Sequence, residues 1–174
     1  MDGDTHGDPV HQTYHTGLRN QHAVEMTAVE ICKRQIERIE HYPEIKARLQ
    51  QHAAETEAQA HRLEAILERH GSSRSVLKDT WMTLQGNLAA MMHVPASDEI
   101  LKNMFANAAL EHFEIAAYTS LIAMAQAVGD TAAIAPLQQS LAEEQSMGDF
   151  IQAQTAPTTE RYLALTRGGT KAAV

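Results

Sequence analysis

Residues 110–118, Leu-Glu-His-Phe-Glu-Ile-Ala-Ala-Tyr, lie within a long run that has the pattern of one α-helix. One face of this predicted helix is apolar except for Glu111 at its centre, and Glu114 lies one turn further along, on the same side. Its members, three or four positions apart, are Leu101, Met104, Ala108, Glu111, Ile115, Tyr118 and Ile122. A carboxylate on a face that packs into a core is unfavourable unless it is protonated, paired or bound to a cation. The rest of the chain must therefore supply what neutralises these acids.

The composition is typical of an all-α protein with one substantial core. The chain has 174 residues, of which 44% are hydrophobic and only 5% aromatic, and no window alternates as a half-buried strand does. The net charge of −8 argues against a general affinity for nucleic acids or anionic membranes. No run approaches the roughly 20 apolar residues of a membrane span. The single cysteine, Cys32, lies on an apolar helical face, and we expect a buried thiol in a cytoplasmic protein.

Four long helical runs are predicted, at 16–41, 44–70, 98–128 and 130–153. Short connections at Pro43 and Gly129 make each consecutive pair an antiparallel hairpin. A much longer connection separates the two hairpins, and its run 76–94 has the pattern of a further helix. The sequence therefore predicts a four-helix up-down bundle with a long crossover that contains an extra helix.

Domain limits are predicted from the turn-forming residues near both ends of the chain. Residues 1–15 are rich in Gly, Asp and His without helical periodicity, and we expect a flexible tail there. Pro157 is expected to end the fourth long helix. The helical bundle then occupies 16–154, and 155–174 form a short helix and a tail.

Each of the four long helices carries an acid near the middle of its apolar face. The predicted metal ligands are Glu25, His52, Glu55, Glu111, Glu114 and Glu144. Five carboxylates close together cannot all ionise without a strong neutralising charge, and a pair of metal ions would supply it. Carboxylates with an imidazole suit iron or manganese. Zinc is a further option, although zinc sites more often contain additional His or Cys.

Local sequence around these positions resembles the ferritin-like di-metal carboxylate proteins and, within them, the YciE/YciF family of stress-associated bacterial proteins. The segments that carry the resemblance are Gly17-Leu18-Arg19-Asn20, the Glu25 position, residues 52–59 (His-Ala-Ala-Glu-Thr-Glu-Ala-Gln), residues 111–118 and Leu141-Ala142-Glu143-Glu144. The resemblance implies a ferritin-like bundle with a dinuclear metal site, often as a homodimer. The apolar face of 76–94 is where we expect a partner copy to dock.

The ligand pattern departs from the usual ferritin-like one, which has Glu-x-x-His on two helices. The second helix here carries His52 followed by Glu55, and no His lies one turn from Glu144. The predicted site is therefore richer in carboxylate than its relatives.

Two classes of function follow from this sequence. The first is a di-iron or di-manganese protein that acts on O2, peroxide or the metal ions themselves, with enzymatic turnover left open. The alternative is a metal-free dimeric helical scaffold whose buried acids form a proton-sharing network. A storage cage is disfavoured because no shell-forming surface is evident.

Overall fold

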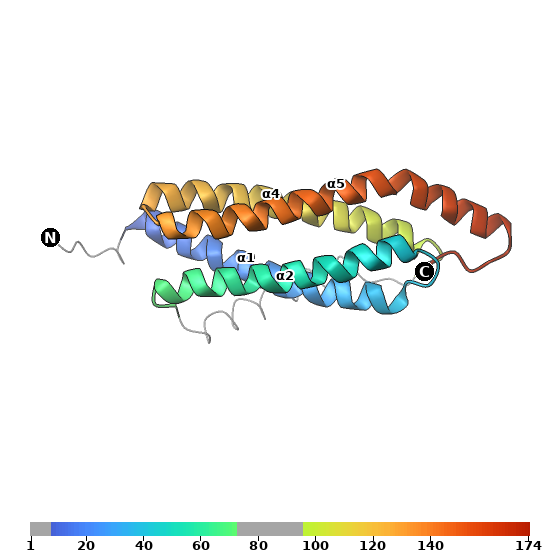
Figure 1. The fold of residues 1–174 in the computed structure, drawn as a ribbon, viewed down its shortest axis with the longest axis horizontal. Helices are drawn as coiled ribbons and strands as arrows, with labels where there is room; N and C mark the ends of the chain where they lie inside the picture. Colours follow the sequence, from blue (N-terminus) through green and yellow to red (C-terminus); the bar gives the residue numbers. More distant parts are fainter. Residues whose placement is uncertain (1–7, 73–95) are drawn as a thin grey trace.

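The computed structural model describes residues 8–72 and 96–174, and within these ranges every regular element is an α-helix. Four helices are present: α1 (Pro9–Arg38), α2 (Pro43–Arg69), α4 (Glu99–Val128) and α5 (Thr131–Arg167). They lie alongside one another as one elongated bundle (Figure 1). The predicted all-α, four-helix architecture is confirmed.

The chain direction in Figure 1 shows how the two hairpins are connected. Helices α1 and α2 are antiparallel neighbours, as are α4 and α5, and α1 also packs on α4 while α2 packs on α5. The end of α2 and the start of α4 lie at opposite ends of the bundle. The extra helix predicted at 76–94, and the dimer face predicted on it, lie outside the described residues.

Helix α1 begins at Pro9, so the predicted tail 1–15 is wrong for residues 9–15. The side chain of Asp8 accepts a hydrogen bond from the Val10 N–H at 3.1 Å, and Pro occupies the first helical position. Tyr14 is fully buried, and its hydroxyl donates to Asp130 at 3.0 Å. Packing against the distant α4–α5 turn thus stabilises a helical turn that local periodicity did not reveal.

Helix α5 continues through Pro157 to Arg167, so the predicted stop and the separate short helix after it are wrong. Pro157 has no N–H to donate to the carbonyl one turn earlier. Because Pro157 is exposed, that carbonyl lies on the solvent side of the helix. The next residue, Thr158, is buried, and Tyr162 packs against the core cluster at this end of the bundle. Tertiary packing therefore outweighs the local preference for a helix end.

The last three residues turn back and are buried against the end of the bundle. The Tyr42 hydroxyl donates to the Ala172 carbonyl at 2.6 Å, and the Ile100 N–H donates to the Ala173 carbonyl at 2.9 Å. The His41 N–H donates to the carbonyl of Val174 at 3.3 Å. This segment links the α1–α2 turn to the start of α4.

Deleting residues 172–174 should lower the free energy of unfolding by about 2 kcal/mol or more. The deletion leaves the buried hydroxyl of Tyr42 and the Ile100 N–H without their acceptors. Urea denaturation followed by circular dichroism measures the change. Deletion of the exposed residues Thr170 and Lys171, which shortens the reach of the same segment, should be similarly costly, whereas Lys171→Ala should be neutral. Unchanged stability of the truncated chain would contradict this account.

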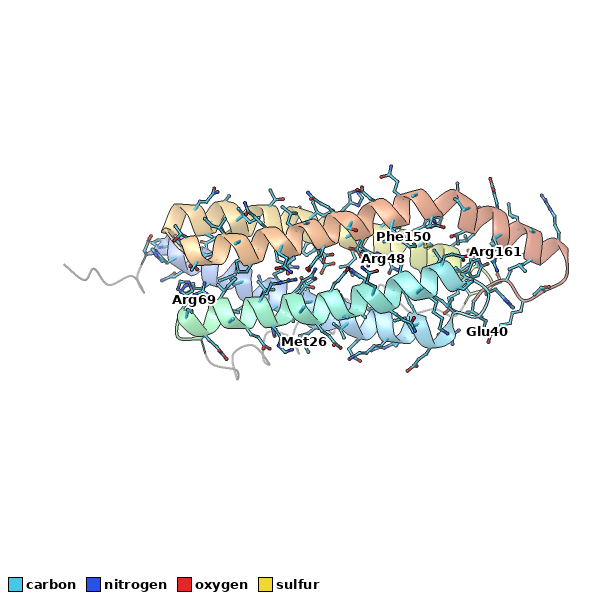
Figure 2. All side chains as sticks on the ribbon, viewed as in Figure 1. Met26, Glu40, Arg48, Arg69, Phe150 and Arg161 are labelled. Carbon is cyan, nitrogen blue, oxygen red and sulfur yellow. The ribbon has the colours of Figure 1, made fainter. Side chains whose placement is uncertain are left out.

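Two apolar clusters fill the interior at the two ends of the bundle. The cluster at the α4–α5 turn consists of Tyr14, Leu18, Leu63, Ile66, Leu67, Tyr118, Leu121, Ala125, Ala133 and Leu137. The cluster at the α1–α2 turn consists of Cys32, Ile39, Tyr42, Ile45, Leu49, Ala53, Ile100, Met104, Met147 and Ile151. Between them, at mid-length, the helices carry buried polar and charged side chains. Figure 2 shows Arg48 near this level, whereas Arg69 and Arg161 mark the two ends.

Candidate metal centre

The mid-level polar layer receives an acid or imidazole from each of the described helices α1, α2, α4 and α5. Its charged or titratable members are at most 5% exposed, although such side chains are seldom fully buried without a partner. They are Glu25 on α1, His52 on α2, Glu111 and Glu114 on α4, and Glu144 on α5. Each follows the three- and four-residue spacing of its helix's apolar face, so burial of that face draws the acid inside.

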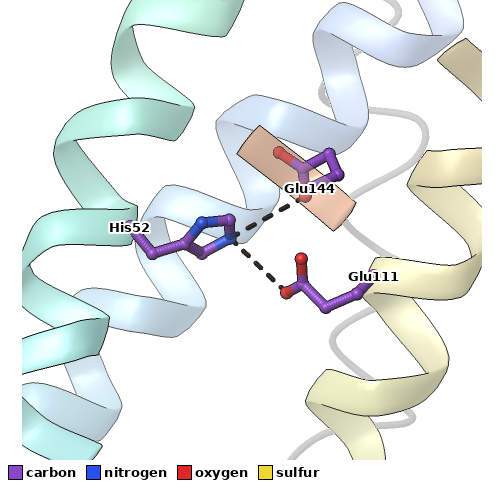
Figure 3. Close-up of side chains that lie close together, drawn as sticks. All are labelled: His52, Glu111 and Glu144. Carbon is purple, nitrogen blue, oxygen red and sulfur yellow. Dashed lines mark ion pairs between the residues drawn. The ribbon is translucent and has the colours of Figure 1, made fainter. Parts of the chain in front are cut away.

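His52, Glu111 and Glu144 form the centre of the layer (Figure 3). The His52 Nε2 atom lies 3.4 Å from Glu111 Oε1 and 3.9 Å from Glu144 Oε2. One potential ligand atom from each residue lies within 4.8 Å of the other two. Among the described residues, no other group of three or more His, Cys, Asp or Glu side chains meets this criterion. This trio is therefore able to surround a single cation.

The surroundings of Glu144 and His52 alter the protonation of these two side chains. For Glu144, burial and the neighbouring acids raise the carboxyl pKa to about 10. For His52, burial favours the neutral ring, but hydrogen bonding and charge from Glu111 and Glu55 outweigh it and raise the pKa to about 10. Without a cation, bound protons must neutralise the buried carboxylates.

Glu25 is fully buried and bonded on one oxygen only. Its Oε1 accepts from Gln21 Nε2 at 2.8 Å and from the Tyr118 hydroxyl at 2.5 Å, and its Oε2 has no hydrogen-bond partner. Burial raises its pKa to about 7, against the opposing effect of these two hydrogen bonds. The second oxygen is thus left available to a proton or a metal ion.

Glu114 is 1% exposed, and neither of its carboxylate oxygens has a hydrogen-bond partner. Burial, with the charges of Glu25, Glu144 and Glu111, raises its pKa well above the ordinary value. Both oxygens of Glu144 and one oxygen of Glu111 are likewise without hydrogen bonds. Buried polar atoms are rarely left unsatisfied in native proteins, and a cluster of them indicates a missing ion, water or proton. The oxygen-rich donor set with one imidazole fits iron or manganese.

Glu55 lies on the other side of the imidazole. Its carboxylate accepts from Arg48 at 2.9 Å and from Gln51 at 2.7 Å, and its Oε2 lies 3.4 Å from His52 Nδ1. The nearby His52 ring, with the hydrogen bonds from Gln51 and Arg48, lowers its pKa to about 2, despite partial burial. His52 thus stands between Glu55 and Glu111, and the ligand role predicted for Glu55 stays a prediction.

Several neighbours of the layer were not predicted as part of a site. Gln21 precedes Glu25 by four residues, and Ser140 precedes Glu144 by four, so helical spacing was the signal that placed them beside the acids. Tyr118 follows Glu114 by four residues, but its hydroxyl donates a hydrogen bond to Glu25 across the bundle. The sequence offered no signal for that choice of partner.

The membrane-span criterion gives a negative result for the described helices. None of α1, α2, α4 and α5 combines the length and the apolar character that crossing a bilayer requires.

Solved structures of two bacterial proteins have a similar architecture. A solved structure of a protein from Xanthomonas campestris pv. campestris matches with a TM-score of 0.77 and 24% identity, covering 92% of this chain and 99% of that one. YcfI from Rhodopseudomonas palustris matches with a TM-score of 0.66 and 20% identity, covering 87% of this chain and 97% of that one. At these identities the likeness shows a shared fold. Residues 9–164 match the family described as "Domain of unknown function (DUF892)", and the chain belongs to that family.

Proposed function

We propose that this protein is a ferritin-like dinuclear iron or manganese protein, of the YciE/YciF kind, that acts in stress on O2, peroxide or the metal ions. The observation that carries the proposal is the set of carboxylate oxygens without hydrogen bonds on Glu25, Glu111, Glu114 and Glu144. These oxygens lie in one buried layer, and an imidazole reaches into it. Metal ions would neutralise the negative charge of these carboxylates more completely than the few hydrogen-bond donors that the described residues provide.

His52, Glu111 and Glu144 would hold one ion, because their ligand atoms already converge. Glu25 and Glu114 would complete a second position, and Glu55 would either bind metal or orient the ring of His52 through Nδ1. When bound, a pair of such ions supplies the redox chemistry or the Lewis acidity of the site.

The protein's own residues would shape that chemistry. The Tyr118 hydroxyl holds a proton against Glu25 Oε1, and the apolar clusters on both sides of the layer keep water from the acids. Arg48 fixes the carboxylate of Glu55, which faces the Nδ1 of His52.

The alternative function is a metal-free dimeric scaffold, and one observation favours it. The raised pKa values of Glu25, Glu114 and Glu144 allow these acids to be protonated and to share protons without a metal. The metal content of the purified protein distinguishes the two functions.

Elemental analysis of protein purified without chelator should find iron or manganese at about two ions per chain, the number that bridging carboxylates usually hold. Glu144→Gln should lose at least one ion, because it neutralises an acid without hydrogen-bond partners in the buried layer. The matched control is Glu143→Gln on the same helix, since Glu143 is paired with Arg62 and should retain full metal content. Anomalous scattering locates the ions. Protein that neither purifies with metal nor takes it up would support the scaffold instead.

We also propose that the protein is a homodimer of the cytoplasm. Two large apolar side chains on α4, Phe105 and Phe113, are 57% and 56% exposed. Beyond Lys102 the only Asp, Glu, Lys or Arg side chains of α4 are the buried Glu111 and Glu114, so its outer face carries no such charge. Light scattering should give twice the chain mass, and the interface should bury more than about 1,000 Å². Phe105→Lys/Phe113→Lys should shift the protein to monomer, and a wild type that is monomeric at every concentration would contradict the assignment.

A further inference from the structure

A surface groove lies between α4 and α5, directly outside the carboxylate layer. It encloses about 280 Å³ and is lined by His112, Ile115, Gln145, Gly148, Asp149 and Gln152. Two of these residues, His112 and Gln145, directly follow Glu111 and Glu144 in the sequence, so they lie on the outer side of the helix turns that carry the buried acids. A larger cavity of about 450 Å³ lies at the end of the bundle. It is lined by residues such as Tyr42 and Arg161 and by none of the acids of the buried layer.

The floor of the groove is thin at Gly148. This residue is buried and lies one turn beyond Glu144. A Cβ atom placed there would lie 3.6 Å from Ile115 Cδ1 and 3.8 Å from Glu111 Cβ. Both are ordinary contact distances, so the α5 backbone at Gly148 lies directly over the stem of Glu111, with no side chain of Gly148 between them.

The groove also presents groups that bind cations. The Nδ1 of His112 lies 2.8 Å from the Ala108 carbonyl oxygen, and because a carbonyl only accepts, Nδ1 must carry the proton. The Nε2 atom of the neutral ring is then the one with a lone pair for a metal, an arrangement common among metal-binding histidines. The exposed carboxylate of Asp149 and the amides of Gln145 and Gln152 line the same groove.

We propose that the groove between α4 and α5 is the entrance by which a divalent cation reaches the carboxylate layer, with His112 Nε2 and the Asp149 carboxylate as its first ligands. The inference rests on the proposed metal-binding function. An incoming hydrated ion exchanges part of its water for the imidazole, carboxylate and amide groups of the groove. It then passes Gly148 to the stronger set of acids inside, so the groove governs the rate of loading and the buried layer governs the final occupancy.

The test follows uptake of Co²⁺ by full-length protein from which metal has been removed, using the visible absorption of the bound ion. His112→Ala/Asp149→Asn should slow uptake by about tenfold or more, a typical effect of losing a charged entry site, at unchanged final occupancy. The matched control is His61→Ala/Glu160→Gln, which makes comparable changes at exposed positions outside the groove and should load at the wild-type rate.

A second pair of variants tests the path without changing charge. Gly148→Ala should fold, because the added methyl group meets its neighbours at contact distance, and should slow loading by closing the floor. Gly168→Ala is its control, since a Cβ there meets only backbone oxygens at 3.5 and 3.6 Å. Circular dichroism confirms that each variant is folded.

The outcomes of these experiments test the proposed entrance independently of the proposed metal site. If wild-type protein binds Co²⁺ and both groove variants load as fast as it does, the entrance is wrong and the metal site stands. The entrance is equally wrong if His112→Ala/Asp149→Asn loads at the wild-type rate to a lower occupancy. If the wild type binds no Co²⁺, the proposed function fails and the entrance with it.

Discussion

Replacing Glu111 with alanine should remove at least one metal ion and lower the stability of the metal-bound protein more than that of the metal-free protein. Glu111 lies 3.4 Å from His52 Nε2, is 3% exposed and has one oxygen without a hydrogen bond. Loss of a ligand from a buried site removes the binding free energy that metal adds to folding. In metal-free protein the same change deletes one of several crowded acids but also a partner of His52, so stability should fall less than in the metal-bound protein. Elemental analysis and urea denaturation, with and without chelator, measure both effects.

Glu30→Ala provides the control for Glu111→Ala. Glu30 is a partly exposed acid on α1, outside the buried layer, so its removal should leave metal content and both stabilities within about 0.5 kcal/mol of wild type. Glu111→Ala that keeps full metal content and destabilises the metal-free and metal-bound forms equally would make Glu111 a structural residue. The interpretation of the whole layer as a metal site would then be wrong.

The metal-free protein should lose stability as the pH rises above about 4.5. Burial raises the pKa of Glu25 from 4.5 to about 7, so the folded state holds a proton that the unfolded state has released. The free energy of unfolding therefore falls with pH across this window, by about 3 kcal/mol for Glu25. The raised pKa values of Glu144 and His52, both about 10, act in the same direction and extend the decline toward pH 10.

The metal-bound protein should respond to pH in the opposite sense. Ligating carboxylates must be deprotonated, so metal binds more tightly as the pH rises, and the stability gap between the two forms should widen. Glu55 adds a separate loss at low pH, because its pKa is lowered to about 2 and its stabilising contribution disappears as the pH falls from 4.5. Urea denaturation at pH 5, 7 and 9, with Mn²⁺ or with chelator, measures the gap. A gap that is constant over this range would exclude metal binding by these acids.

Much of the layer could be predicted from the sequence because helical periodicity is a local property. Glu25, Glu111 and Glu144 each interrupt an apolar face at three- and four-residue spacing, and all three are buried in the structure. The turn at Gly129 could also be predicted from the sequence. In the structure Gly129 has φ +77° and ends α4 in the left-handed conformation.

Helix ends were less predictable because packing decides them. Pro157 would end an isolated helix, yet α5 continues because Thr158 is buried and the partly buried Tyr162 and Leu165 pack against the core. Residues 9–15 have little periodicity of their own, and Tyr14 becomes helical and buried through its contact with Asp130. Both contacts depend on elements far away in the sequence.

By itself, the sequence determined the helical class of this protein and the face of each helix that turns inward, because both depend on spacing within one segment. Only the tertiary structure decided how the buried groups pair: Tyr118 with Glu25, and His52 between Glu55 and Glu111. It also placed Gly148 against Glu111, in the lining of the groove between α4 and α5. These pairings depend on the rotation of each helix about its axis and on its shift along the bundle. The packing of both apolar clusters sets those two quantities, and no single helix encodes them.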